Sequence, residues 1–178
     1  YQGLHTILIN NSIDSIYSGM TPSFIQNYYN YDEIAIDLQR LCFNAGATFI
    51  EDEVVKLDTN LKKIILMNRP SLNYDLLSIN TGSISNLKKI KIQKNAKYVF
   101  VKPINNLVKN LKVLDDLIKS KPNSVISIIG GGVAAFEISF ALTERYCKKK
   151  SIKIISSNPL SEGNLNLRSK NKLIGISQ

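Results

Sequence analysis

Cysteine and histidine are scarce in this chain of 178 residues, which holds two cysteines and a single histidine. Cys42 and Cys147 lie far apart and form no Cys-x-x-Cys pair, so the sequence encodes neither a redox dithiol nor a zinc site. Two such thiols are typical of free, buried cysteines in a reducing compartment, and we expect a cytoplasmic protein. His5 stands at the start of an expected strand and is given no chemical role.

Long apolar runs are missing as well. No stretch approaches the roughly 20 apolar residues that a transmembrane helix requires. The first residues do not form the basic and then apolar segment of a signal peptide. Because the chain does not begin with Met, we expect that an N-terminal portion is missing.

Acidic residues are fewer than basic ones, 14 against 23, which gives a formal charge of +9. A basic chain can bind nucleic acid or an anionic membrane. Here the lysines are scattered among Asn and Ile, and no basic stripe is interleaved with aromatic residues. We therefore interpret the charge as a solvated surface and expect no nucleic-acid partner, with a nucleic-acid or anionic-lipid footprint as the alternative.

One stretch organises the chain. Residues 125–129 are apolar and β-branched, which predicts a buried parallel strand. The run breaks at Gly130, Gly131 and Gly132, and a helical pattern follows over about 133–149. Strand, glycine turn and helix in this order are typical of a dinucleotide-binding unit.

The spacing Gly130-x-Gly132-x-x-Ala135 assigns a separate role to each small residue. Gly130 permits the tight turn, Gly132 lets the backbone approach a pyrophosphate, and Ala135 allows the helix to press on the strand. The helix N-terminus offers free N–H groups and a partial positive charge to the phosphates. The alternative is a tight turn between strand and helix that binds nothing.

Before this stretch, the chain predicts a strand at 5–9 and a helix with Asp32 as its N-cap and Gly46 just past its end. The apolar face of that helix is formed by Ile34, Leu38, Leu41, Cys42 and Ala45. Aromatic residues crowd the segment before it, and we expect them to pack a loop onto the body, with a ligand-facing role second: Phe24, Tyr28, Tyr29 and Tyr31.

Short alternating runs follow at 48–50, 54–57, 63–67 and 74–79, and predict a small antiparallel meander with a more buried last strand at 76–79. A further short strand is expected at 98–101. Pro103 is well placed to start a helix. The apolar face of that helix is formed by Ile104, Leu107, Val108, Leu111, Leu114 and Ile118. After the glycine motif and its helix, residues 151–155 are expected to form a second strand and complete a βαβ unit.

Several motifs occur in a characteristic order: Tyr17-Ser-Gly-Met20, the meander, Tyr74-Asp-Leu-Leu-Ser-Ile-Asn-Thr-Gly-Ser83, Val101-Lys-Pro-Ile104 and Gly130-Gly-Gly-x-x-Ala-x-Glu137. Together they resemble the FAD-dependent pyridine-nucleotide oxidoreductases, in particular the type II NADH dehydrogenase-like branch. Within that branch the chain is most similar to the reductase module sometimes fused to selenide, water dikinase. The resemblance implies an α/β fold, a partial two-dinucleotide-binding (Rossmann-like FAD/NAD(P)) fold with a small antiparallel β-meander.

The resemblance also implies a domain order. Residues 1–84 would form part of an FAD-binding domain, 85–120 a connecting segment with a helix, and 121–178 the start of an NAD(P)-binding domain. The first GxGxxG unit, which grips the FAD pyrophosphate in this family, is absent, as is the C-terminal interface domain. We therefore expect an internal piece of a longer reductase, which alone could fail to hold FAD tightly.

Cofactor contacts are implied for further residues. Thr81 and Gly82 would pass close to FAD, and Val54 would touch its adenine, while the segment 17–20 would lie near the flavin. Glu137 would lie near the nicotinamide end of NAD(P)H. It is equally well interpreted as a solvated carboxylate in the first turn of its helix, favoured by the helix dipole.

The position after the second strand of the βαβ unit departs from the expected pattern. Ser156 or Ser157 stands where an acid would accept hydrogen bonds from the 2′-OH of NAD. Without the acid, the extra phosphate of NADP is not repelled, yet no Arg follows closely to bind it. The choice between NADH and NADPH stays open.

The activity implied is hydride transfer from NAD(P)H to FAD, with electrons passed to a quinone or another small acceptor. Association with a selenide, water dikinase module and peripheral attachment to the inner face of a membrane are further implications. No side chain is identified as an acid, base or nucleophile. Two other hypotheses remain, a nucleotide-binding module without redox turnover and a basic interaction protein that binds nucleic acid or anionic lipid.

Overall fold

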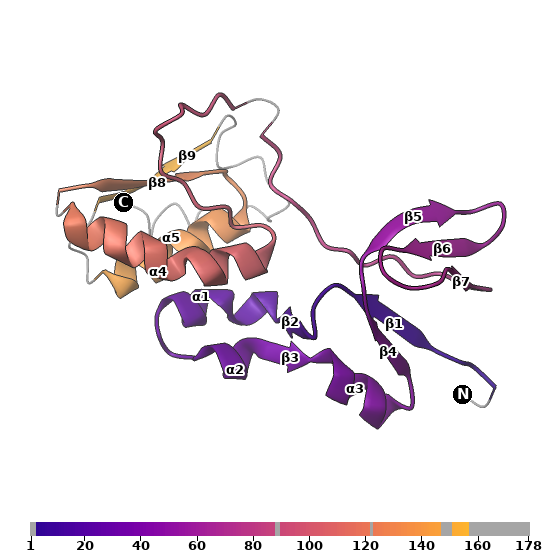
Figure 1. The fold of residues 1–178 in the computed structure, drawn as a ribbon. Coiled ribbons are helices and arrows are strands. Elements are labelled where there is room, and N and C mark those ends of the chain that lie inside the picture. Colours follow the sequence, from indigo (N-terminus) through magenta and orange to yellow (C-terminus); the bar gives the residue numbers. More distant parts are fainter. Residues whose placement is uncertain (1–2, 88–89, 122, 147–150, 157–178) are drawn as a thin grey trace, which may run out of the picture. The chain divides into compact units, whose positions relative to one another are not determined.

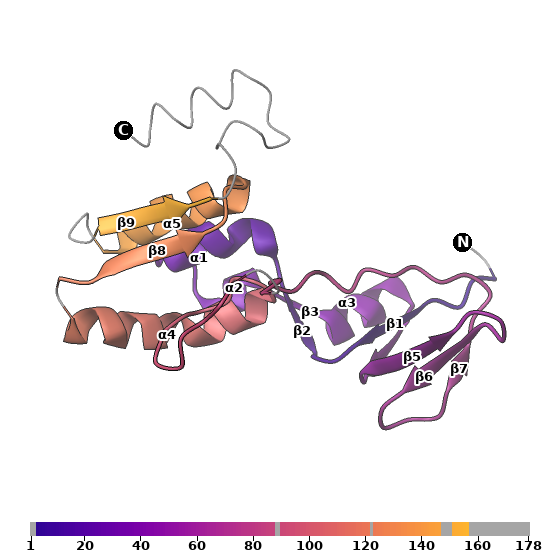
Figure 2. The ribbon, with the colours of Figure 1, turned by 90° about the horizontal axis from the view of Figure 1, so that it is seen from above.

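The structure is a computed structural model that describes residues 3–87, 90–121, 123–146 and 151–156 (Figures 1 and 2). The chain divides into two compact units. Unit 1 consists of residues 1–17 and 35–84, and unit 2 consists of residues 18–34 and 85–178. This division follows contacts within the chain, whereas the predicted division by cofactor stays a prediction.

In its described residues, unit 1 contains three small sheets and one helix. Its elements are β1 (Ile7–Asn10), β2 (Asp14–Ile16), β3 (Ala35–Asp37), α3 (Leu38–Ala45), β4 (Thr48–Glu51), β5 (Val54–Asp58), β6 (Lys63–Leu66) and β7 (Leu72–Asn73). Strands β1 and β4 are parallel, β2 and β3 are antiparallel, and β5, β6 and β7 form an antiparallel meander. The predicted first strand and the meander are thus present.

The helix predicted to begin at Asp32 is interrupted. A short helix, α2 (Tyr31–Ile34), is capped by Asn30, whose side chain accepts a hydrogen bond from the Glu33 N–H at 3.2 Å. The chain then pairs with β2 as β3, and Asp37 caps α3 by accepting from the Arg40 N–H at 2.8 Å. Pairing with the distant β2 therefore outweighs the local helical pattern. The predicted end was right, since Gly46 is left-handed just after α3.

Two further predictions for unit 1 were wrong. β4 is not part of the meander, because it pairs in parallel with β1. Residues 76–79 form no strand, and the Leu76 side chain is 93 % exposed. A strand requires a neighbour to share its backbone hydrogen bonds, and no strand in the described part of the chain pairs with this segment.

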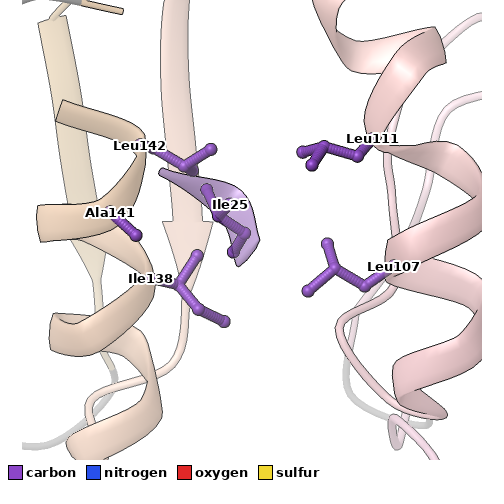
Figure 3. Packing of buried hydrophobic residues seen from close by; sticks show 6 residues of the cluster. All are labelled: Ile25, Leu107, Leu111, Ile138, Ala141 and Leu142. Carbon is purple, nitrogen blue, oxygen red and sulfur yellow. The ribbon is translucent and has the colours of Figure 1, made fainter. Parts of the chain in front are cut away.

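Unit 2 contains a parallel strand pair and three helices that share one core. Its elements are η1 (Ser18–Met20), α1 (Thr21–Ile25), α2, α4 (Ile104–Ser120), β8 (Val125–Ile129), α5 (Val133–Arg145) and β9 (Ser151–Ile155). The core cluster joins α1, α4 and α5 and consists of Ile25, Leu107, Leu111, Ile138, Ala141 and Leu142. Figure 3 shows Ile25 between the side chains of α4 and those of α5.

The predicted helix after Pro103 is confirmed as α4, which buries Leu107, Leu111 and Ile118. The strand predicted at 98–101 is absent. Val99 and Val101 nevertheless pack against the core cluster. The apolar pattern therefore predicted the burial of these side chains correctly, but it wrongly predicted that their backbone pairs with another strand. Among the crowded aromatics, Phe24 packs against the same cluster. The tyrosines are exposed and do not pack the loop as predicted: Tyr28, Tyr29 and Tyr31.

Strands β8 and β9 pair in parallel, as predicted, with Gly130 directly after the pair. Within the described residues, one face of this pair is covered. Ile126, Ile128 and Ile152 pack against the core cluster, whereas Val125 and Ile129 on the opposite face are exposed. The prediction of a buried strand was therefore half right. Among the described helices, none combines the length and the apolarity that crossing a membrane would need.

Candidate functional site

The turn between β8 and α5 is held in place by β9. The Gly130 N–H donates a hydrogen bond of 2.8 Å to the Ile155 carbonyl oxygen at the end of β9. Gly130 has a φ of 138°, a conformation that side chains rarely allow. The backbone of the turn therefore explains glycine at this position without any ligand.

At Gly132, in contrast, the protein itself does not explain why the residue is glycine. It is the N-cap residue of α5, with an ordinary extended backbone (φ −84°, ψ 174°). A Cβ atom built on it would meet no protein atom within 4 Å. Neither the backbone nor the surroundings in the described chain require glycine here, so the open space in front of it is free for a ligand to approach.

The N-terminus of α5 is suited to an anion. No side chain caps it, and its first turn contains no acidic residue. The first N–H groups of a helix lack partners within the helix, and the helix dipole places partial positive charge there. Ala135 is only 8 % exposed, and its N–H donates to the Gly132 carbonyl oxygen at 2.9 Å, which closes the first turn tightly. A phosphate or pyrophosphate fits this arrangement.

Glu137 is the fifth residue of α5 and therefore lies beyond its first turn. The interpretation as a first-turn carboxylate stabilised by the helix dipole was wrong, because that effect falls off within the first turn. Its side chain is exposed and lines a hollow of about 190 Å³. Ala134, Glu137 and Ile138 supply the α5 wall, since residues three and four apart share a helix face.

The opposite walls of this hollow, which we call the α1–α5 pocket, come from η1, from α1, and from the start of α4 with the segment just before it. They are formed by Ser18, Gly19, Thr21, Pro22, Val101, Lys102 and Ile104. Thr21 is 3 % exposed, and its Oγ1 atom has no hydrogen-bond partner in the described structure. Sequence reasoning missed Thr21, because no local signal reveals the contact between α1 and the distant α5.

Ser156 directly follows β9 and is exposed, so it stands at the same strand end as the Gly130 turn. Ser157, its alternative, lies outside the described residues. The structure thus brings together Gly130, Gly131, Gly132 and Ser156 at the ends of two paired strands, with Ala135 and Glu137 following on α5. Their contacts with a cofactor stay predictions.

Of the residues predicted to lie near FAD, Val54, Thr81 and Gly82 belong to unit 1, whereas residues 18–20 belong to unit 2. Val54 begins β5 and is exposed, at a register irregularity of the meander. Thr81 and Gly82 lie in an exposed segment without regular secondary structure. Gly82 has a φ of 76°, and a Cβ built on it would meet nothing within 4 Å. A close approach of the backbone to a ligand is therefore possible at Gly82, although its positive φ alone already favours glycine.

A buried carboxylate stiffens the same unit beside Val54. Asp52 accepts hydrogen bonds from the Glu53 N–H at 2.7 Å and from the Asn68 N–H and side-chain amide at 3.1 and 3.0 Å. Burial acts to raise the pKa of Asp52, but these donors, with a contribution from Arg69, hold it below its usual value. The carboxylate thus ties the start of β5 to the end of β6 and has a structural role.

No protein-family model and no curated protein sequence matches this chain. Solved structures do match. NADH:rubredoxin oxidoreductase from Clostridium acetobutylicum is 23 % identical with a TM-score of 0.65, over 96 % of this chain and 44 % of that one. Sulfide:quinone oxidoreductase from Aquifex aeolicus is 17 % identical with a TM-score of 0.71, over 97 % of this chain and 42 % of that one.

A third match is NDH2 from Plasmodium falciparum in complex with NADH, at 18 % identity and a TM-score of 0.68, over 87 % of this chain and 37 % of that one. The chain thus spans less than half the length of these structures. At such identities the likeness establishes the fold alone. The predicted fold class is confirmed, an α/β, Rossmann-like fold that this chain shares with these oxidoreductases.

Proposed function

We propose that this chain is part of a flavin-dependent NAD(P)H oxidoreductase and that unit 2 binds the dinucleotide NAD(P)H. One observation carries the proposal. The N-terminus of α5 has no side-chain cap, and the space beside its N-cap residue, Gly132, contains no protein atom within 4 Å of a built Cβ. In a βαβ unit with the Gly130-x-Gly132-x-x-Ala135 spacing, this is where a pyrophosphate binds. The shared fold with NADH-utilising oxidoreductases supports the same assignment.

The residues present fit such a ligand. The N–H groups at the start of α5 would bind the pyrophosphate, and Gly132 would allow its close approach. Ser156, beyond β9, would face the adenosine ribose. Glu137 lies five residues after Gly132, or about 7.5 Å along the helix axis, so it would be reached by the nicotinamide end.

For FAD, unit 1 offers an exposed backbone at Thr81 and Gly82 and the exposed Val54 at the meander. Bound NAD(P)H and FAD supply the redox chemistry, a hydride transfer from nicotinamide to flavin and onward passage of electrons. The contribution of this chain is to bind the two cofactors and to orient them. A quinone or another small molecule is proposed as the acceptor, because the chain contains no Cys-x-x-Cys dithiol that could relay electrons.

Two broader assignments belong to the same proposal. Association with a selenide, water dikinase module and peripheral membrane contact are proposed from the sequence resemblance. A cytoplasmic location is proposed from the two cysteines, which are typical of free thiols in a reducing compartment. Co-purification of the native protein with kinase activity that makes selenophosphate tests the first. Cell fractionation before and after a high-salt wash tests the second.

Nucleotide binding is tested by calorimetric titration of the 178-residue chain with ADP-ribose and with NADH. Gly132→Asp adds bulk and charge against the pyrophosphate and should abolish binding of both ligands, with an unchanged circular dichroism spectrum. The matched control is Asn123→Asp, which adds the same charge at an exposed position before β8 and should bind normally. Equal affinity of Gly132→Asp and the unsubstituted chain would overturn the proposal.

A second function, nucleotide binding without redox turnover, would need unit 2 alone, which contains both the Gly132 turn and Glu137. The two functions differ in one measurement. Protein reconstituted with FAD should oxidise NADH in the presence of a water-soluble quinone if the chain carries the redox function. Nucleotide binding without any NADH oxidation, with FAD bound, would favour the second function.

A further inference from the structure

Divided by unit, the charge of this chain is uneven. Unit 2 contains 18 basic and 7 acidic residues, a formal charge of +11, whereas unit 1 contains 5 basic and 7 acidic residues, a charge of −2. Much of the excess in unit 2 comes from one stretch, because the sequence between Asp75 and Asp115 contains eight lysines and no acidic residue. Such a concentration of one sign produces a positive potential that attracts anions.

Part of this stretch is an exposed loop, residues 90–98, which we call the lysine loop. It contains no helix or strand, and all of its residues are exposed. Directly after it, Val99 and Val101 pack against the core cluster, so the loop is attached to the body of unit 2. Its charged side chains are Lys91, Lys94 and Lys97.

The charges of the lysine loop are not neutralised by the described part of the chain. The ion pair found there joins Arg145 to Asp115 and involves none of the three lysines. In sequence, the nearest acidic residues are Asp75 and Asp115, which lie 15 or more positions from the loop. Lysine is a compact, hydrated point charge without the planar fork that lets arginine hold a phosphate by two hydrogen bonds. The loop is therefore suited to attract an anion at a distance rather than to hold it in one geometry.

The same stretch of chain reaches the start of α5, where the pyrophosphate is proposed to bind. Lys102 lines the α1–α5 pocket together with Ala134, which lies in the first turn of α5. Ser85 Oγ donates to the Lys102 carbonyl oxygen at 3.2 Å, so the chain before the lysine loop and the chain after it meet beside this pocket. The first turn of α5 contains no acidic residue that would oppose the positive potential.

We infer that Lys91, Lys94 and Lys97 attract the anionic dinucleotide, speed its association with unit 2 and favour NADPH over NADH. Both dinucleotides carry a pyrophosphate, and the 2′-phosphate of NADPH adds a charge of about −1.5 to −2 at pH 7. Attraction by a fixed positive potential grows with the charge of the ligand, and it changes the association rate more than the dissociation rate. This inference rests on the proposed dinucleotide binding and adds a kinetic preference between the two cofactors.

The test is stopped-flow mixing of the 178-residue chain with NADH and with NADPH, followed by the fluorescence of the reduced nicotinamide. The variant replaces all three lysines of the loop by Gln (Lys91→Gln, Lys94→Gln and Lys97→Gln). At about 10 mM salt, where the Debye length is about 30 Å, its association rate constant should fall about threefold for NADH and about tenfold for NADPH. At about 1 M salt, where the Debye length is about 3 Å, the differences should disappear. The dissociation rate constants should be unchanged.

A matched control removes the same charge from unit 1. Lys56→Gln, Lys62→Gln and Lys63→Gln, combined in one chain, should leave both association rate constants unchanged. Equal slowing by the two triple variants would overturn the inference, because the net charge of the chain and not the lysine loop would then set the rate. Both variants should keep the circular dichroism spectrum of the unsubstituted chain.

The outcomes separate this inference from the proposed function. If the loop variant associates with both dinucleotides at the original rates, the inference is overturned while nucleotide binding stands. Faster dissociation that persists at high salt would also overturn it, because the lysines would then contact the bound dinucleotide. Loop-dependent co-sedimentation with phosphatidylserine vesicles, at unchanged association rates, would assign the loop to a membrane instead. If neither dinucleotide binds the unsubstituted chain, the proposed function and this inference fall together.

Discussion

Asp115 of α4 and Arg145 of α5 form a two-pronged ion pair within unit 2. Arg145 donates from Nε to Asp115 Oδ1 at 2.8 Å and from Nη2 to Oδ2 at 2.6 Å. Its Nη1 donates to the Ile25 carbonyl oxygen and to Asn27 Oδ1, both at 2.6 Å. One guanidinium group therefore joins the ends of α1 and α5 to α4, the same helices that bound the core and the α1–α5 pocket.

Removing the carboxylate should destabilise unit 2. The Arg145 and Asp115 side chains are 12 % and 21 % exposed, so Asp115→Asn leaves a largely desolvated guanidinium without its counter-charge. We expect a loss of about 2 kcal/mol in the free energy of unfolding, measured by urea denaturation. Asp116→Asn, at the exposed neighbour, should change it by less than about 0.5 kcal/mol. Equal effects of the two substitutions would contradict the assigned role.

The same pair predicts a pH dependence. Hydrogen bonds from Arg145, opposed by burial and aided by Tyr146, lower the pKa of Asp115 below its ordinary value of 3.8. A group with a lowered folded-state pKa stabilises the fold above its unfolded pKa, and this stability is lost as pH falls through the folded pKa. The difference in unfolding free energy between the unsubstituted chain and Asp115→Asn should be constant near pH 7 and shrink below about pH 4. A difference that stays constant down to pH 2 would refute the ionic origin.

The two outer glycines of the motif should respond differently to the same added methyl group. Gly130→Ala forces a side chain into a φ of 138° and should cost about 1–3 kcal/mol of stability. Gly132→Ala meets ordinary backbone angles and no protein atom within 4 Å, so stability should fall by no more than about 1 kcal/mol, the cost of Ala at an N-cap. Its affinity for ADP-ribose should fall at least tenfold, because the methyl group occupies the space of the pyrophosphate. Thermal unfolding and calorimetry check the two effects, and normal binding by Gly132→Ala would count against the site.

Local signals in the sequence predicted the glycine turn, α4 and the parallel pair of β8 and β9. In each case the information lies in neighbouring residues: the β-branched run before Gly130, Pro103 at the helix start, and apolar residues at helical spacing. The predictions that failed depend on distant pairing. The helix over 32–45 is interrupted because residues 35–37 pair with β2, and residues 76–79 form no strand.

In the candidate site too, residues with a local sequence signal were predicted, and residues that depend on distant packing were not. Gly132 was recognised from spacing, and the structure added the physical reason, an open Cβ position at an uncapped helix. Thr21 was not recognised, since its burial against α5 depends on the packing of α1 through Ile25. A hydroxyl without a hydrogen-bond partner can be identified only from a structure, because the positions of all possible partners must be known.

The position after β9 should determine the preference between NADH and NADPH. Ser156 is exposed beside the strand end that holds the Gly130 turn. An acid there would accept hydrogen bonds from the ribose 2′-OH of NADH and repel the 2′-phosphate of NADPH. Ser156→Asp should therefore raise the ratio of NADH to NADPH affinity by about tenfold, measured by calorimetry on the 178-residue chain. Ser151→Asp places the same charge at the opposite end of β9 and should leave the ratio unchanged, because Ser151 and Ser156 are about 16 Å apart along the strand. If both variants shift the ratio equally, the effect is one of overall charge, and the adenosine ribose does not bind beside Ser156.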